Sequence, residues 1–149
     1  MSARGEMSVT IHEEDFDPWE RLRLLSRLWD EGRAGALASF IGVARADEAD
    51  GVAVSAIFLE HYAGMTERVL GELEDEAARR WGLLATCVEH RVGRVDVGCP
   101  IVLVGVLSER RGDAFAACRF LVEELKSRAP FWKCEERTDG TRHWVEGNN

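Results

Sequence analysis

The segment Ile-Val-Leu-Val-Gly-Val-Leu-Ser (residues 101–108) is nearly all apolar, which is typical of a strand buried at the centre of a sheet. A second strand is predicted directly upstream, over residues 83–92. The residues between them, 93–100, hold two glycines and one proline and therefore predict a turn region. A buried sheet is thus expected in the middle of the fold.

Three helices are predicted around this sheet, over residues 18–32, 66–81 and 112–129. Asp17 can cap the first, because its carboxylate can accept hydrogen bonds from the first backbone amides of a helix. Gly82 ends the second helix. Pro130 ends the third, since the residue before a proline avoids helical geometry.

Further strands are predicted over residues 8–13, 35–45, 52–62, 131–137 and 141–146. The strands 35–45 and 52–62 flank a polar loop and are expected to pair as a hairpin. The last two flank Asp139-Gly140, which predicts a closing hairpin with a tight turn. Because most neighbouring strands are joined by short turns, the pattern predicts one α+β domain, residues 1–149, with a largely antiparallel sheet.

The charge balance argues against a broad nucleic-acid surface. The chain of 149 residues has 27 acidic and 19 basic residues, a net charge of −8, whereas such a surface would be basic. The longest apolar run is far below the ~20 residues that span a bilayer, so no membrane association is expected. No signal peptide is visible in the sequence, which predicts a cytoplasmic location.

The cysteines and histidines do not predict a metal site. The four cysteines, at positions 87, 99, 118 and 134, form no C-x-x-C pair of the kind that binds zinc. The four histidines stand well apart in the sequence and form no H-x-x-x-H pair. Free thiols in a reducing compartment and no bound metal are therefore expected.

The lysines give the first indication of chemistry. Seventeen of the 19 basic residues are arginine, and the only lysines are Lys126 and Lys133. A G+C-rich genome would account for the arginine bias, and a lysine in the last turn of a helix can simply complement the helix dipole. Lysine, however, offers an amine that can lose its proton or act as a nucleophile, which arginine does not.

Three arginines follow predicted strand ends and are candidates for binding an anion. Arg110 and Arg111 come directly after the buried strand, and Arg45 ends the strand over residues 35–45. A strand end, a helix end and a strand start can converge, so these arginines are expected near the two lysines, where guanidinium groups can grip an anion. The alternative interpretation is that Arg110 and Arg111 form only a solvated strand end.

Six motifs together resemble the large, catalytic subunit of molybdopterin synthase, the MoaE family. They are F-I-G-V-A-R (40–45), L-E-H-Y-A-G-M-T (59–66), R-W-G-L (80–83), H-R-V-G (90–93), V-G-V-L-S (104–108) and L-K-S-R-A-P-F-W-K (125–133). The last is the most specific, and the resemblance extends from about Val9 to Glu146. It implies an α+β fold with an α/β hammerhead core and an antiparallel β-sheet subdomain.

The resemblance also implies a reaction and a partner. Members convert cyclic pyranopterin monophosphate, precursor Z, to molybdopterin by inserting two sulfurs as a dithiolene. The sulfur arrives as a thiocarboxylate on the C-terminal Gly-Gly of a small ubiquitin-like subunit of the MoaD type. The large subunit is a homodimer within a heterotetramer, and no cofactor or metal is implied for this step.

Functional residues carry over only where the motifs match. Lys126 and Lys133 match the two active-site lysines, which the resemblance makes catalytic and substrate-binding. The other residues that it places in the substrate site are Val43, Ala44, Arg45, Arg110, Arg111, Cys134 and Glu135. Phe115, Phe131 and Trp132 are expected to line an apolar groove for the incoming tail.

Two departures from the family pattern keep alternatives open. Arg110 stands where many members have histidine, and arginine cannot act as a general base. That residue is the one feature in favour of a non-catalytic dimeric scaffold that only binds the sulfur carrier. The short tail also offers no basic residue to reach a partner's site. A further alternative is a persulfide sulfurtransferase that uses Cys134.

Overall fold

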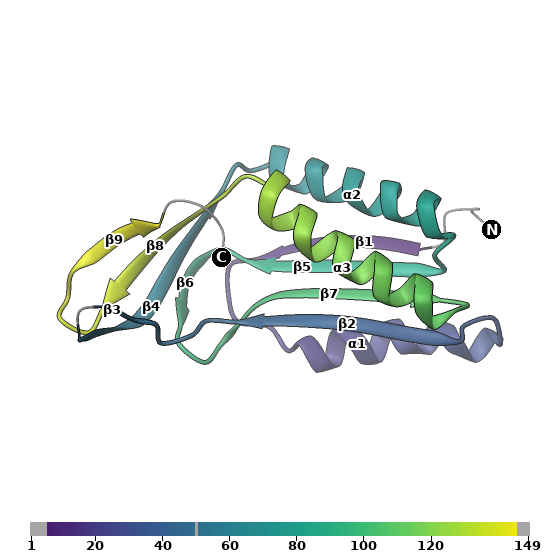
Figure 1. The fold of residues 1–149 in the computed structure, drawn as a ribbon, viewed down its shortest axis with the longest axis horizontal. Helices are drawn as coiled ribbons and strands as arrows, with labels where there is room; N and C mark the ends of the chain where they lie inside the picture. The colour runs from purple at the N-terminus through teal and green to yellow at the C-terminus, as the bar shows by residue number, and fades with distance from the viewer. Residues whose placement is uncertain (1–5, 50, 146–149) are drawn as a thin grey trace.

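The computed structural model describes residues 6–49 and 51–145 and shows two β-sheets joined end to end in an elongated molecule (Figure 1). The first sheet has the strand order β1-β5-β7-β2. Its strands are β1 (Glu6–His12), β2 (Ala36–Val43), β5 (Ala85–Arg91) and β7 (Pro100–Ser108). β1 runs parallel to β5, and the other two pairings are antiparallel.

β7 is the predicted central strand, and it is buried on both of its faces. Val102, Val104 and Val106 belong to one hydrophobic core, while Leu103 and Leu107 belong to a second core on the opposite face. Alternate residues of a strand point to opposite faces, so a strand covered on both sides needs an unbroken apolar sequence. The prediction from residues 101–108 is therefore confirmed.

Gly105 allows a helix to pack closely against β7. A Cβ atom at this position would lie 2.9 Å from both Sγ of Cys87 and a methyl carbon of Leu25. Real Cβ atoms essentially never make contacts that short, so a larger residue would force the side chains of Leu25 and Cys87 to shift. The single glycine in the apolar run thus reflects a packing requirement.

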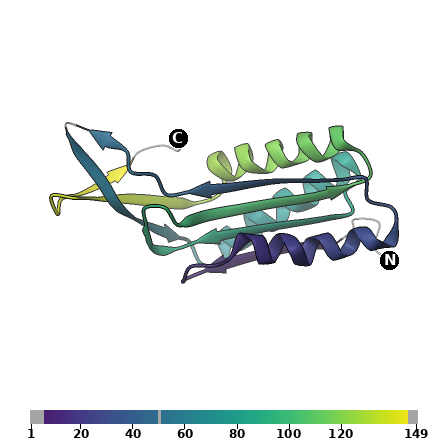
Figure 2. The same cartoon turned by 90° about the horizontal axis from the view of Figure 1, so that it is seen from below.

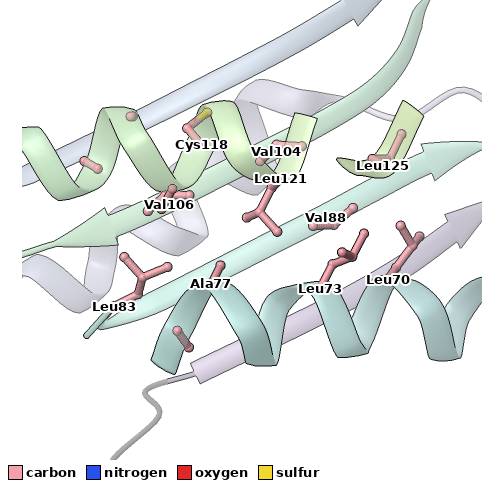
Figure 3. Close-up of a cluster of buried hydrophobic side chains, with 14 of the residues drawn as sticks. Leu70, Leu73, Ala77, Leu83, Val88, Val104, Val106, Cys118, Leu121 and Leu125 are labelled. Atoms are coloured by element: carbon pink, nitrogen blue, oxygen red, sulfur yellow. The ribbon is translucent and has the colours of Figure 1, made fainter. Parts of the chain in front are cut away.

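Helices cover both faces of the first sheet. α2 (Met65–Trp81) and α3 (Arg111–Arg128) lie on one face, and α1 (Pro18–Ser26) lies on the other (Figure 2). Figure 3 shows leucines of α2 and α3 pointing toward the valines of β5 and β7. All three predicted helices are confirmed.

The first helix is shorter than predicted. Asp17 caps α1 as expected, and its carboxylate accepts a hydrogen bond of 2.9 Å from the amide of Trp19. The α-helix ends at Ser26, whose hydroxyl donates to the carbonyl of Arg23 and competes with the helical backbone pattern. A 3₁₀ turn, η1 (Arg27–Glu31), continues the segment to Gly32.

The second sheet is entirely antiparallel and is built around β4. Its strands are β3 (Glu48–Ala49), β4 (Val52–His61), β6 (Gly93–Asp96), β8 (Phe131–Arg137) and β9 (Arg142–Val145). β4 pairs with β6 and with β8, and β8 pairs with β9 as the predicted closing hairpin. The expected helix-covered core with an antiparallel sheet subdomain is confirmed.

The hairpin expected between residues 35–45 and 52–62 is wrong. β2 pairs with β7 along its whole length in the first sheet, while β4 lies in the second sheet. Only the two-residue strand β3 pairs with the start of β4. β3 and β6 were not expected, because strands of two and four residues are too short to give a periodic pattern.

The chain passes from the first sheet and its helices into the second sheet three times, and it returns twice, from β4 to α2 and from β6 to β7, all at the same end of the first sheet (Figure 1). β2 passes into β3, β5 passes into β6, and α3 passes into β8. The turn between β5 and β6 is made by Gly93, whose φ of +82° is a left-handed conformation that favours glycine. Residues from all three crossings meet at this junction.

Candidate functional site

A cavity of about 370 Å³ lies at the junction of the two sheets. Its walls come from β2, β4, β5, β7, α3 and β8, so it depends on both sheets. The cations that line it are Arg45, Lys126 and Lys133, and the apolar residues include Val43, Ile57, Leu59, Val102, Leu125, Phe131 and Trp132. His90 is the remaining titratable side chain on its wall.

The turn after α3 holds the two lysines on the same cavity. Lys126 lies in the last turn of α3, Lys133 lies near the start of β8, and Pro130 separates the two elements. The hydroxyl of Thr66, at the beginning of α2, donates a hydrogen bond of 3.2 Å to the carbonyl of Pro130. Thr66 is fully buried, so this contact fixes the turn against α2.

Arg45 reaches the cavity from the end of β2. Its neighbour Ala44 is buried, and its amide donates to the carbonyl of Cys99 at 3.0 Å while its carbonyl accepts from Gly98 at 2.7 Å. These two bonds fix the backbone from which Arg45 extends. The guanidinium is largely exposed, and its Nε lies 2.9 Å from a carboxylate oxygen of Asp47.

The cavity is positively charged although the protein is acidic. Three cations line it, and no carboxylate is among the described residues on its wall, whereas the whole chain has a net charge of −8. Cations beside an apolar, partly enclosed surface bind an anion more strongly than the same cations in open water. The charge pattern therefore favours a ligand with an anionic group and an apolar or aromatic part.

His90 forms part of the inner wall and is neutral. Its ring stacks on Phe131, with centroids 3.7 Å apart and an interplanar angle of 14°. Nδ1 lies 2.7 Å from the backbone carbonyl of Arg91, which can only accept, so Nδ1 carries the proton. The pKa of His90 is lowered to about 4, mainly by burial and to a smaller extent by the nearby His61, against the opposing effect of the hydrogen bond to the Arg91 carbonyl.

The structure brings four of the expected site residues together on the cavity: Val43, Arg45, Lys126 and Lys133. Ala44 supports Arg45 through its backbone. Cys134 is buried and does not line the cavity. Glu135 is half-buried farther along β8 and is also absent from the wall.

The expected convergence of Arg110 and Arg111 with the lysines does not occur within one chain. β7 ends at Ser108, and both arginines lie at the beginning of α3, whereas Lys126 lies in its last turn. At 1.5 Å per residue, about 22 Å of helix separate Arg111 from Lys126. Phe115 is exposed near that same end of α3 and does not line the cavity, unlike Phe131 and Trp132.

His90 is the residue that sequence reasoning missed, although the sequence held a signal for it. Val88 points into the core beneath α2 and α3, and the strand period of two places His90 and Thr86 on that same buried face. Thr86 is bonded to Glu74, and a second polar residue on a buried face indicates a hydrogen-bond requirement at His90 as well. The motif H-R-V-G contains it, and its C-x-x-H spacing to Cys87 indicates no metal site, because the two side chains point to opposite faces of a strand.

Two features are absent from residues 6–49 and 51–145, the part of the chain that the structure describes. No group of three histidine, cysteine or acidic side chains there is arranged to hold a metal ion. None of the described helices is both long and apolar enough to cross a bilayer.

Comparison with known proteins identifies the family. Residues 11–128 match the family model described as "MoaE protein". The molybdopterin synthase catalytic subunit of Pseudomonas aeruginosa is 45% identical over 95% of this chain and 91% of its own length. That of Escherichia coli is 48% identical, with the same coverage of both chains.

Solved structures agree with the sequence comparison. The molybdopterin biosynthesis MoaE protein of Burkholderia ambifaria superposes with a TM-score of 0.76 at 38% identity, over 97% of this chain and 91% of its own. The molybdopterin synthase structure from Staphylococcus aureus superposes with a TM-score of 0.73 at 26% identity, over 96% and 97% of the two chains. The cavity thus lies in a fold shared with these proteins, and the chain belongs to the MoaE family.

Proposed function

We propose that this chain is the catalytic subunit of molybdopterin synthase. It converts cyclic pyranopterin monophosphate to molybdopterin by inserting two sulfurs as a dithiolene. The sulfurs come from the thiocarboxylated C-terminus of a small ubiquitin-like subunit of the MoaD type. The observation that carries the proposal is the cavity in which both lysines of the chain meet Arg45 beside an aromatic and apolar wall.

The composition of the cavity suits the substrate. A cyclic phosphate is an anion, and Arg45 and Lys133 can hold it with charge-assisted hydrogen bonds. The pterin ring is flat and aromatic in part, and Phe131 and the aliphatic side chains offer it an apolar surface. A volume of about 370 Å³ lies within the ordinary range for a small-molecule site.

Lys126 takes the chemical role in this proposal. Its amine, at the end of α3, can hold the acyl terminus of the sulfur carrier and transfer a proton as sulfur leaves the carbonyl. Arginine keeps its proton in proteins and is limited to binding and charge stabilisation. Lys133, across the Pro130 turn, holds the substrate against the same site.

The mouth of the cavity suits the tail of a sulfur carrier. Val43 and Trp132 line the cavity, and each is about half exposed, at 49% and 48%. Apolar side chains that are left in water beside a pocket are a common feature of peptide-binding surfaces. We assign this rim to the extended C-terminal tail, whose terminal Gly-Gly is slim enough to pass between them.

In a homodimer, Arg110 and Arg111 can reach the substrate site of the partner. Both are exposed and lie too far along α3 to reach the cavity of their own chain. In a two-fold dimer, a surface of one copy can contribute to the site of the other. We propose that these arginines bind the substrate anion in the partner's cavity, within a heterotetramer of two large and two small subunits.

Reconstitution tests the proposed function directly. The chain is mixed with precursor Z and a thiocarboxylated small subunit, and dithiolene formation is measured. The matched control is the same small subunit without its terminal Gly-Gly, which should still dock in part but deliver no sulfur. Absence of dithiolene with the intact carrier, or equal product with the truncated one, would contradict the proposal.

A further inference from the structure

His90 presents the cavity with a hydrogen-bond acceptor of fixed tautomer. Because Nδ1 donates to the Arg91 carbonyl, the lone pair of the ring lies on Nε2. The Arg91 carbonyl belongs to the same strand and Phe131 covers one face of the ring. His90 lines the cavity, and with Nδ1 bonded to the backbone, Nε2 is the one acceptor that its side chain has left to offer a ligand.

This acceptor has no equivalent on the cavity wall. The other polar side chains among the described lining residues are Arg45, Lys126, Lys133 and Trp132. With the lysines charged, all four can donate hydrogen bonds but cannot accept them. The remaining lining side chains are hydrocarbon, apart from Gly42, which has none. A ligand group that must donate a hydrogen bond to a side chain therefore finds its partner at His90.

The two kinds of polar group on the cavity wall suit different parts of one ligand. A phosphodiester anion carries only acceptors, so its favourable partners are the three cations, and the lone pair of Nε2 would repel it. A reduced pterin carries several N–H donors on its rings. Because burial lowers its pKa, His90 is neutral at physiological pH, and Nε2 keeps the lone pair with which it can accept a hydrogen bond.

Building on the proposed function, we infer that Nε2 of His90 accepts a hydrogen bond from an N–H group of the substrate's pterin ring. His90 is thereby a specificity-determining residue, which turns the ring toward β5 and the phosphate toward the lysines and Arg45. A ring that lacks the donor leaves Nε2 desolvated without a partner. Discrimination by unpaired buried acceptors is stronger than discrimination by apolar contact alone.

Two substitutions separate the two nitrogens of His90. In His90→Asn the side-chain amide can still donate where Nδ1 does, but nothing reaches the position of Nε2. In His90→Gln the longer side chain can place its oxygen near the Nε2 position. Losing one buried hydrogen bond of this kind costs about tenfold in affinity. We expect His90→Asn to bind precursor Z about tenfold more weakly than wild type, and His90→Gln to recover most of that loss.

Inorganic phosphate is the control ligand for both variants. Its affinity should be unchanged in His90→Asn, because it occupies the cation end of the cavity, and should fall in Arg45→Ala. Thermal unfolding of each variant reports the loss of the Nδ1 hydrogen bond separately. Wild-type affinity of His90→Asn for precursor Z would overturn the inference, as would an equal loss of phosphate binding in that variant.

A measurement on the unmodified protein keeps the test independent of variant folding. The ¹⁵N resonance of His90 Nε2 reports whether its lone pair accepts a hydrogen bond. We expect it to shift on saturation with precursor Z and to stay unchanged with inorganic phosphate. An unchanged ¹⁵N chemical shift on saturation with precursor Z would overturn the inference, even if the chain converts precursor Z with its sulfur carrier. Failure of that conversion would instead contradict the proposed function.

Discussion

His90 and Phe131 stack face to face across the boundary between the two sheets, with ring centroids 3.7 Å apart. His90 is the last but one residue of β5 in the first sheet, and Phe131 begins β8 of the second. The pair therefore forms a wall of the cavity and a packing contact between the two sheets at once. A change in the angle between the sheets would move Lys133, two residues along β8, relative to Lys126 on α3.

Replacing Lys126 should stop the chemistry without unfolding the protein. Lys126→Ala should lower sulfur transfer by about 10²-fold or more, in the range of lost proton-transfer catalysis. Lys126→Arg should fail to rescue it, because arginine keeps the charge but not the exchangeable proton. Single-turnover dithiolene formation, with carrier binding measured in parallel, provides the test.

The matched control for Lys126 is Arg128→Ala. Both residues lie in the last turn of α3, and Arg128 forms exposed ion pairs with Glu76 and Glu124. If Lys126 only complemented the helix dipole, the two alanine variants would behave alike. Full turnover by Lys126→Arg would exclude a role in which the amine exchanges a proton or acts as a nucleophile.

Removing the Arg45 side chain should weaken substrate binding and leave the fold intact. Its guanidinium is largely exposed, and the backbone bonds that fix Ala44 do not involve it. Loss of one charge-assisted phosphate contact should cost about 1.5–3 kcal/mol, or one to two decades in affinity. Titration of precursor Z into Arg45→Ala measures this, with Arg23→Ala as the control, because Arg23 is an exposed arginine of α1, a helix that does not line the cavity. Equal affinity in both variants would place the phosphate elsewhere.

The sequence predicted the helices and strands better than it predicted which strands pair. The central strand over 101–108 was recognisable because burial on both faces demands an unbroken apolar run. The hairpin between residues 35–45 and 52–62 was wrong, because short connections usually join paired strands but here residues 44–47 pass from one sheet to the other. Strand pairing depends on long-range packing that no local pattern records.

The site was predicted only in part, again because local sequence does not record long-range packing. Lys126 and Lys133 flank a proline in one short segment, so local sequence places them together. Arg110 and Arg111 were misplaced because nothing local states which end of β7 faces the junction. His90 reaches the cavity only through the contact between β5 and β8, which joins residues far apart in the chain.

Glu74 should make the stability of the protein depend on pH. Burial between α2 and the sheet raises its pKa from 4.5 to about 8, although a hydrogen bond from Thr86 opposes the shift. The folded state therefore binds more protons than the unfolded state between these values, so the free energy of unfolding should fall as pH rises from about 4.5 to 8. The loss should be on the order of 3–5 kcal/mol.

Glu74→Gln removes this titration while keeping an oxygen that can accept from Thr86. Its free energy of unfolding should vary less between pH 5 and 8 and should exceed that of wild type at pH 8. Urea unfolding at several pH values measures both trends. The exposed Glu72 lies on the same helix, and Glu72→Gln should follow the wild-type profile. An identical profile for Glu74→Gln would show that another group governs the dependence.

The three buried cysteines, Cys87, Cys118 and Cys134, should be unreactive and dispensable for sulfur transfer. Burial raises the pKa of Cys87 to about 12 and that of Cys118 to about 11, which leaves almost no thiolate at neutral pH. Cys134 is buried away from the cavity. Iodoacetamide should leave turnover unchanged, and Cys134→Ala should retain activity. Loss of sulfur transfer in Cys134→Ala, with its thermal stability preserved, would support a persulfide route instead.

Mixed dimers test whether Arg111 acts in the partner's cavity. A chain with Lys126→Ala and a chain with Arg111→Ala should each be strongly impaired alone. In a mixed dimer, the Arg111→Ala chain keeps its own lysines and receives Arg111 from the other copy. Unfolding and refolding equal amounts together should therefore restore roughly a quarter of wild-type activity, because half of the dimers are mixed and one of their two sites is intact.

The result separates a shared site from a site within one chain. If Arg111 served the cavity of its own chain, each site of a mixed dimer would still carry one defect, and mixing would restore nothing. Refolding each variant alone controls for losses on handling, and a monomer in solution would contradict the shared site outright. Restoration places the beginning of α3 of one copy against the end of α3 of the other, because about 22 Å of helix separate Arg111 from Lys126 within a single chain.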